Sequence, residues 1–159
     1  MTTKTLVLGI GNTLLGDEGA GVYAVRALAA GQEVLQDQDI EFLDGGTLSF
    51  TLAAPIEEAD QLIVIDAAQL RADAGTVRVF EGAEMDAFLG ADRKRSVHEV
   101  GLIDLMSIAR LTDSLPARRA LIGIQPQYVD WAEQPTAAVA AAIPKACEEA
   151  VSLIRRWSA

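Results

Sequence analysis

One histidine and several carboxylates are the residues of this chain whose types and spacing could do chemistry. Glu18, Asp44 and Asp66 each follow a short apolar segment, and His98 is the only histidine. An imidazole combined with carboxylate oxygens suits borderline divalent ions such as nickel or zinc. Three protein ligands would leave coordination positions open for water or for a substrate group. A carboxylate can also work without a metal, as a general base.

Each of these residues also has a purely structural interpretation. Glu18 could be a first-turn carboxylate that the helix dipole stabilises, and Asp66 could cap a turn or a helix. His98 could be an exposed residue of a loop or a helix start. Each residue taken alone favours the structural interpretation, whereas the three taken together favour a shared site.

Two phosphate-binding motifs fail in the glycine-rich segment 9–16. Leu14 occupies the position of the third glycine in a dinucleotide-binding fingerprint, where a helix would have to pack closely. The spacing from Gly11 to Gly16 resembles a phosphate loop, but Asp17 and Glu18 replace its Lys-Ser/Thr pair. Carboxylates there would repel phosphate, so the sequence argues against a nucleotide site.

A serine or cysteine nucleophile is not favoured. Such a residue needs an adjacent base, the chain has one histidine, and no Gly-x-Ser-x-Gly elbow occurs. Cys147 falls on the apolar face of the expected last helix, which indicates a buried core residue.

The elements that must position these residues follow from apolar runs and their periodicity. Strands are expected at 5–10, 40–43, 61–65, 76–80 and 120–124, and helices at 18–29, 50–59, 101–111 and 137–157. Pro144 should kink the last helix or break it for one turn. The alternation predicts a single α/β domain over 1–159, with a mostly parallel twisted sheet, helices on both faces and an antiparallel edge strand at 76–80.

Parallel strands bring their carboxyl ends to one edge, and ligands bind in the crevice beyond that edge. Glu18, with its neighbour Asp17, follows the first strand, Asp44 the second and Asp66 the third. This convergence is the main structural argument for a site.

Composition narrows the function classes. Half of the 159 residues are hydrophobic, the apolar runs fall short of the roughly 20 residues of a membrane span, and no leader sequence is evident. A net charge of −10 argues against a nucleic-acid partner, which needs a basic surface. One cysteine excludes an internal disulfide. We therefore expect a cytoplasmic protein with neither membrane nor nucleic-acid partners.

Five segments, in order along the chain, resemble the hydrogenase maturation proteases. The segment from Gly9 to Gly21 (GIGNTLLGDEGAG) resembles the N-terminal signature of that family. The later matches are Leu43 to Thr47 (LDGGT), Ile65 to Ala67 (IDA), Ser96 to Leu102 (SVHEVGL) and Gly123 to Pro126 (GIQP). Their order and spacing agree over essentially the whole chain.

The resemblance implies an endopeptidase that removes the C-terminal extension of a nickel–iron hydrogenase large-subunit precursor after nickel insertion. By this resemblance Glu18, Asp66 and His98 correspond to metal ligands. The ion would be nickel, which the precursor itself could supply, with zinc or cadmium able to substitute. The mechanism stays open between a metal-assisted one and an aspartic type in which Asp44 or Asp66 is the general base.

Two other function classes stay open. One is a hydrolase of another substrate on the same scaffold, such as a peptidyl-tRNA hydrolase, which the acidic composition disfavours. The other is a non-catalytic assembly factor that binds nickel or the precursor. The basic run Arg93-Lys94-Arg95, just before His98, is interpreted as a solvated loop, with a contact with the precursor as the alternative.

Overall fold

The computed structural model describes residues 3–31, 38–91 and 101–158, which build one five-stranded sheet in the order β2-β1-β3-β5-β4. The strands are β1 Lys4–Ile10, β2 Asp39–Gly46, β3 Gln61–Ala67, β4 Val77–Glu81 and β5 Arg118–Ile124. Strands β2, β1, β3 and β5 are parallel, and β4 pairs antiparallel with β5 at the edge. The predicted α/β architecture and its antiparallel edge strand are confirmed.

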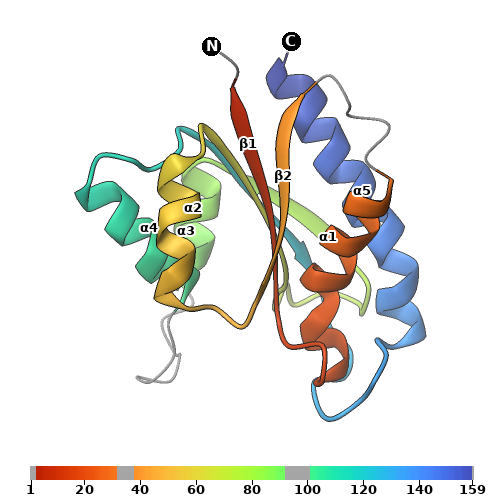
Figure 1. Cartoon of the computed structure of the whole chain (residues 1–159). Coiled ribbons are helices and arrows are strands. Elements are labelled where there is room, and N and C mark those ends of the chain that lie inside the picture. Colours follow the sequence, from red (N-terminus) through yellow and green to blue (C-terminus); the bar gives the residue numbers. More distant parts are fainter. Residues whose placement is uncertain (1–2, 32–37, 92–100, 159) are drawn as a thin grey trace.

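Helices cover both faces of the sheet (Figure 1). The helices are α1 Ala20–Ala30, α2 Ala53–Glu58, α3 Ala83–Ala91, α4 Leu102–Leu111 and α5 Ala137–Ser158, and two short 3-10 turns are η1 Gly16–Gly19 and η3 Phe50–Leu52. Helices α1 and α5 lie on one face, and α2, α3 and α4 lie on the other. No helix in the described part of the chain combines the length and the apolar composition that a membrane span requires.

The central strand β3 shows why both faces must be covered. Ile63 and Ile65 belong to the apolar cluster beneath α1 and α5, whereas Leu62 and Val64 belong to the cluster beneath α2, α3 and α4. All four side chains have no solvent exposure. A parallel strand that is buried on both faces has a nearly continuous apolar sequence, and in β3 this sequence is Gln-Leu-Ile-Val-Ile.

Two features differ from the expectation. Helix α3 was not predicted, because only Met85 and Leu89, one turn apart, are buried in it and its periodicity is weak. Of the two outcomes expected at Pro144, the one-turn break was wrong, because α5 runs unbroken through this residue, and the kink stays a prediction. Pro144 is exposed, while Ala142 and Ala146 on either side of it are buried against the sheet and hold both halves of the helix.

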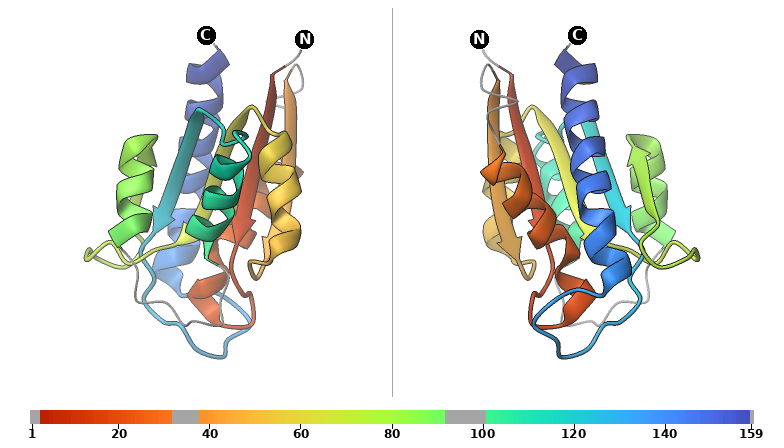
Figure 2. Two further views of the ribbon diagram at one scale, coloured as in Figure 1. Left: turned by 90° about the vertical axis from the view of Figure 1, so that its left-hand side faces the viewer. Right: turned by 90° about the vertical axis from the view of Figure 1, so that its right-hand side faces the viewer.

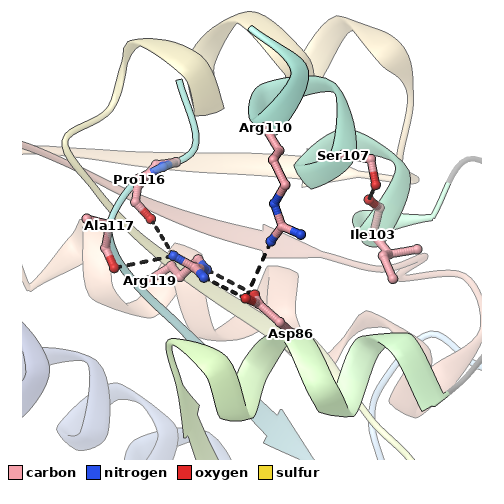
Figure 3. Close-up of polar contacts among 7 residues, drawn as sticks. All are labelled: Asp86, Ile103, Ser107, Arg110, Pro116, Ala117 and Arg119. Carbon is pink, nitrogen blue, oxygen red and sulfur yellow. Dashed lines mark hydrogen bonds and ion pairs between the residues drawn. The ribbon is translucent and has the colours of Figure 1, made fainter. Parts of the chain in front are cut away.

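An ion pair fixes α3 to the sheet (Figure 3). Asp86 of α3 accepts two hydrogen bonds from the guanidinium of Arg119 in β5, at 3.0 Å from Nε and 2.5 Å from Nη2. Arg119 also donates to the carbonyl of Pro116 at 3.1 Å. Arg110 of α4 approaches the same carboxylate at 3.5 Å. These contacts lie at the amino end of β5 and set the position of α3.

The last helix ends at the amino edge of the sheet. Arg118, at the start of β5, donates to the carbonyl of Trp157, and the Ser158 hydroxyl lies 2.8 Å from Oε1 of Gln38, just before β2. Strand β1 begins at the same edge (Figure 1). Both described ends of the chain therefore lie opposite the carboxyl edge of the sheet.

Candidate active site

The carboxyl edge of the sheet has a topological switch point between β1 and β3. From β1 the chain passes through α1 on one face and moves outward to β2, whereas from β3 it moves in the opposite direction, toward β4 and β5, with α3 and α4 on the other face. A crevice forms where neighbouring strands send their connections to opposite faces. Glu18 lies in the loop after β1 and Asp66 lies at the end of β3, so these two predicted site residues flank the switch point.

Glycines let the loop after β1 press against the strands. A Cβ at Gly21 would lie 2.0 Å from the carbonyl oxygen of Ile65, so the start of α1 packs directly on the backbone of β3. A Cβ at Gly11, whose φ is 139°, would lie 1.9 Å from the carbonyl oxygen of Glu18. Only glycine permits both approaches. They bring Glu18 to the end of β3, where Asp66 lies.

Asp17 is fully buried and ties this loop to the segment after β5. Its Oδ2 accepts hydrogen bonds from the backbone N–H groups of Gln127 and Tyr128, at 2.8 and 3.0 Å. Its Oδ1 accepts from the N–H of Thr136 at 2.7 Å, and the Thr136 hydroxyl donates as well. Burial alone would raise the pKa of Asp17, but the hydrogen bonds from Thr136, Tyr128 and Gln127 outweigh it and lower that pKa.

This anchoring role was not predicted from the sequence, which grouped Asp17 with Glu18 as a possible site residue. The anchored segment, residues 125–136, lies at the carboxyl edge of the sheet (Figure 2). It presents Trp131 with 73% of its surface exposed. A buried carboxylate that accepts four hydrogen bonds has a positioning role, and Glu18 is its chain neighbour.

Asp66 lines a cavity on the face covered by α3. Along β3 it follows the alternation of Leu62 and Val64, which pack on that face. The cavity measures about 510 Å³, and apolar side chains of β4, α3 and β5 share its lining with Asp66. Asp66 is partly buried and is itself engaged in a polar interaction. The predicted central-strand carboxylate is therefore placed beside a space large enough for a substrate group.

Asp44 lies on the opposite face of the sheet from Asp66. It is level with Gly9, which is in turn level with Ile65, so Asp44 points toward α1. There it forms an ion pair with Arg26 at 3.1 Å, and its Oδ1 accepts the N–H of Gly46 at 3.0 Å. The structure therefore does not bring the two predicted catalytic aspartates together.

The third predicted metal ligand, His98, lies outside the described residues, as does the basic run 93–95. Within the described ranges there is no group of three His, Cys, Asp or Glu side chains that could hold a metal ion. The assignment of Glu18, Asp66 and His98 as ligands stays a prediction.

Cys147 lies on the apolar face of α5 as expected, but it is only partly buried, at the margin of the core. Its thiol packs against the cluster beneath α1 and α5 and lies 3.5 Å from the carbonyl oxygen of Ala24. Burial raises the pKa of this thiol, which disfavours the reactive thiolate.

The fold and the edge carboxylates define a doubly wound α/β protein with a polar site at its switch point, and comparison with known proteins gives the family. The family model described as HycI, hydrogenase maturation protease, matches residues 22–153. The hydrogenase expression/formation protein HupD of Rhizobium leguminosarum bv. viciae is 41% identical over 97% of this chain and 75% of its own length. The hydrogenase 2 maturation protease of Escherichia coli is 35% identical over 96% of this chain and 91% of its own length.

Solved structures agree with the sequence relatives. The hydrogenase maturating endopeptidase HybD from Escherichia coli superposes with a TM-score of 0.84 at 32% identity, over 97% of this chain and 93% of its own. The [NiFe] hydrogenase maturation protease HybD from Thermococcus kodakarensis gives 0.76 at 31% identity, over 95% and 99%. This chain belongs to the hydrogenase maturation protease family, and it is a peptidase of that family.

Proposed function

We propose that this chain removes a C-terminal extension from the large-subunit precursor of a nickel–iron hydrogenase, in the cytoplasm and after nickel has been inserted. The position of Asp66 carries the proposal. This carboxylate lines a cavity at the carboxyl edge of the sheet, and the glycine-dependent packing of the preceding loop puts Glu18 at the same edge. The family membership of the chain supplies the kind of substrate.

Of the two candidate bases, the geometry favours Asp66. Its cavity offers room for a substrate backbone, whereas Asp44 is paired with Arg26 on the other face. In the proposed mechanism Asp66 acts as in an aspartic-type peptidase: it takes a proton from the water that attacks the scissile carbonyl and passes it to the amide nitrogen, which leaves as an amine when the C–N bond breaks. Asp44 then acts on the site indirectly, because it holds Gly46, whose carbonyl accepts the N–H of Gly11 at 2.8 Å.

The same edge would also suit a divalent ion held by Glu18, Asp66 and His98. Carboxylate oxygens and an imidazole are donors that nickel, zinc and cadmium accept. Such an ion, when bound, supplies Lewis-acid polarisation of the scissile carbonyl. The loop that carries Glu18 is held by the buried Asp17, so this ligand would be pre-oriented by the fold.

Nickel in the precursor is proposed to be part of what the protein recognises. An incomplete set of protein ligands leaves positions for groups that already hold nickel in the partner. Discrimination of about a hundredfold between loaded and empty precursor needs only about 2.7 kcal/mol of differential binding. Cleavage before metal insertion would close an empty site, so recognition of the metal acts as a checkpoint.

The test is incubation of the protein with nickel-loaded and apo-precursor, with intact mass as the readout. Rapid appearance of a shortened large subunit from the loaded precursor supports the proposal. Tight binding with the precursor left intact would instead support a non-catalytic assembly factor. Rapid cleavage of precursor that lacks nickel would show that this protein does not depend on the metal to recognise its substrate.

A further inference from the structure

Apolar side chains line the base of the cavity beside Asp66. Phe80 of β4, Phe88 and Leu89 of α3 and Leu121 of β5 line it, and the two phenylalanine rings stack with their centroids 4.3 Å apart. A volume of about 510 Å³ is within the range of small-ligand sites and accommodates one or two amino-acid side chains. Such a floor favours an apolar group over water.

Both walls of the cavity are fixed. The α3 wall is held by the ion pair between Arg119 and Asp86, which lies in the first turn of that helix (Figure 3). The opposite wall is the segment after β3, where Gln125, a buried residue that directly follows β5, accepts the N–H of Leu70 at 2.6 Å. The cavity is therefore pre-formed, which reduces the ordering cost of binding.

A cationic side chain, that of Arg78, is level with Asp66 across neighbouring strands of the sheet. Asp66 in β3 is level with Gly123 in β5, and Gly123 is level with Arg78 in β4. Residues level with one another in neighbouring strands point to the same face, so Asp66 and Arg78 lie on the same face on either side of Gly123, over which the side chains of Ala68 and Leu70 pack. Two strand spacings separate their Cα atoms by about 10 Å.

A second arginine, Arg71, joins Arg78 in the lining. Both arginines are exposed, and among the residues that the structure describes neither has an ion-pair partner. Arg71 has a φ of 54°, a left-handed conformation in which glycine would be less strained. In a chain with a net charge of −10, two arginines here make the cavity locally attractive to a carboxylate.

We propose that this cavity is the specificity subsite of the peptidase and binds a substrate segment in which an apolar residue and an acidic residue are close together. The apolar side chain enters between Phe88 and Leu121, and the acidic side chain pairs with Arg78 and Arg71. An extended peptide advances about 3.5 Å per residue, so the acidic residue lies within about three positions of the bond held at Asp66. This inference rests on the proposed function, since Asp66 marks the scissile bond.

Substitutions at two exposed alanines of α3 test whether the cavity binds an apolar side chain of the substrate. Ala91 lines the cavity, and Ala87 lies one turn earlier, exposed and outside the lining. We expect Ala91→Trp to raise KM for the nickel-loaded precursor at least tenfold with kcat within about twofold, because bulk in the subsite removes binding common to ground and transition states. Ala87→Trp, the matched control, should stay within twofold in both constants.

Charge reversal tests the acidic part. Arg78→Glu should raise KM at least tenfold, while Arg155→Glu, the same change at an exposed position of α5 on the other face, should not. Precursors are then prepared in which each Asp or Glu within three residues of the cleavage position is changed singly to Lys. One of them should restore cleavage by Arg78→Glu while wild type cleaves it poorly.

The outcomes separate the inference from the function on which it rests. If wild type cleaves the precursor but Ala91→Trp and Arg78→Glu, folded by circular dichroism, match their controls, the subsite assignment is wrong and the peptidase function stands. Absence of any rescuing Lys substitution, or of any acidic residue in that window, overturns the pairing with Arg78. If wild type fails to cleave loaded precursor, the proposed function fails first and the subsite with it.

Discussion

The carboxylate of Asp17 and the backbone N–H of Thr136 lie 2.7 Å apart although 119 residues separate them in the chain. With the hydrogen bonds from Gln127 and Tyr128, this contact joins the loop after β1 to the segment before α5. Asp17 has no solvent exposure, so no water replaces these contacts. The position of Glu18 therefore depends on residues that are distant in sequence.

We expect Asp17→Asn to lower the free energy of unfolding by about 2–3 kcal/mol, because an amide group cannot accept all of these N–H groups and leaves buried donors unpaired. Urea denaturation followed by circular dichroism measures the change. Glu133→Gln, an exposed carboxylate in the same segment, is the control and should change stability by less than about 0.5 kcal/mol. Equal stability of the two variants would contradict the anchoring role.

The two arginines that face Asp86 should contribute unequally. Arg119 binds the carboxylate through two nitrogens and its side chain is 14% exposed, whereas Arg110 approaches at 3.5 Å and is 63% exposed. We expect Arg119→Gln to cost about 2 kcal/mol, since it removes charge-assisted hydrogen bonds from a partly buried carboxylate. Arg110→Gln should cost less than about 0.5 kcal/mol, as is usual for exposed pairs. Thermal or urea denaturation of both variants decides the order.

The same pair gives a pH dependence. The hydrogen bonds from Arg119 hold the pKa of Asp86 below its ordinary value of 3.8. Because the pKa is lower in the folded state than in the unfolded chain, the stabilisation is fully present above about pH 4 and is lost as the pH falls through the folded-state pKa. The stability difference between wild type and Arg119→Gln should therefore be constant from pH 5 to 7 and shrink below pH 4. A difference that grows on acidification would contradict this sign.

Asp44 and Asp66 can be told apart by conservative variants. If Asp66 is the general base, Asp66→Asn should lose at least a hundredfold in cleavage rate while keeping the fold. If Asp44 positions Gly46, Asp44→Asn should retain most of the rate, because an amide oxygen still accepts that N–H, while Asp44→Leu should lose it. Processing of nickel-loaded precursor is the readout. The reverse pattern, with Asp44→Asn inactive and Asp66→Asn active, would reassign the base.

Cys147→Ser should process precursor at a rate close to that of wild type. The thiol is half-buried against Ala24, so the expected cost is confined to stability, about 1 kcal/mol for a hydroxyl in an apolar site. Thiol-directed reagents should likewise leave cleavage intact. Loss of cleavage in a folded Cys147→Ser variant would point to a thiol mechanism.

The strands could be predicted from the sequence because a strand buried on both faces consists of consecutive apolar residues, as in Gln61–Ala67. The sequence also placed Glu18 and Asp66 at one edge, since parallel strands end together. It did not predict that Asp44 faces away from Asp66. Alternation along one strand is readable locally, but the relation between strands depends on the register at Gly9, which is a tertiary property.

Helix α3 and the role of Asp17 were missed for a related reason. The residues of α3 are buried at only two positions, and the helix is held by Arg119, 33 residues further along the chain. Asp17 looks like Glu18 in sequence, and only its contacts with Thr136 and Tyr128 distinguish a structural carboxylate from a site residue. Contacts between distant segments determine both the position of α3 and the role of Asp17. Such contacts cannot be identified from a single sequence.

The placement of both described chain ends at the amino edge gives a practical handle on this protein. Trp157 and Ser158 are held beside the starts of β5 and β2, on the side of the sheet remote from Glu18 and Asp66. A peptide tag or a biotin attached at the C-terminal side should therefore anchor the molecule to a sensor surface with its crevice directed outward. Surface-based binding measurements can then compare the affinities of this protein for nickel-loaded and for empty precursor on one immobilised, uniformly oriented sample.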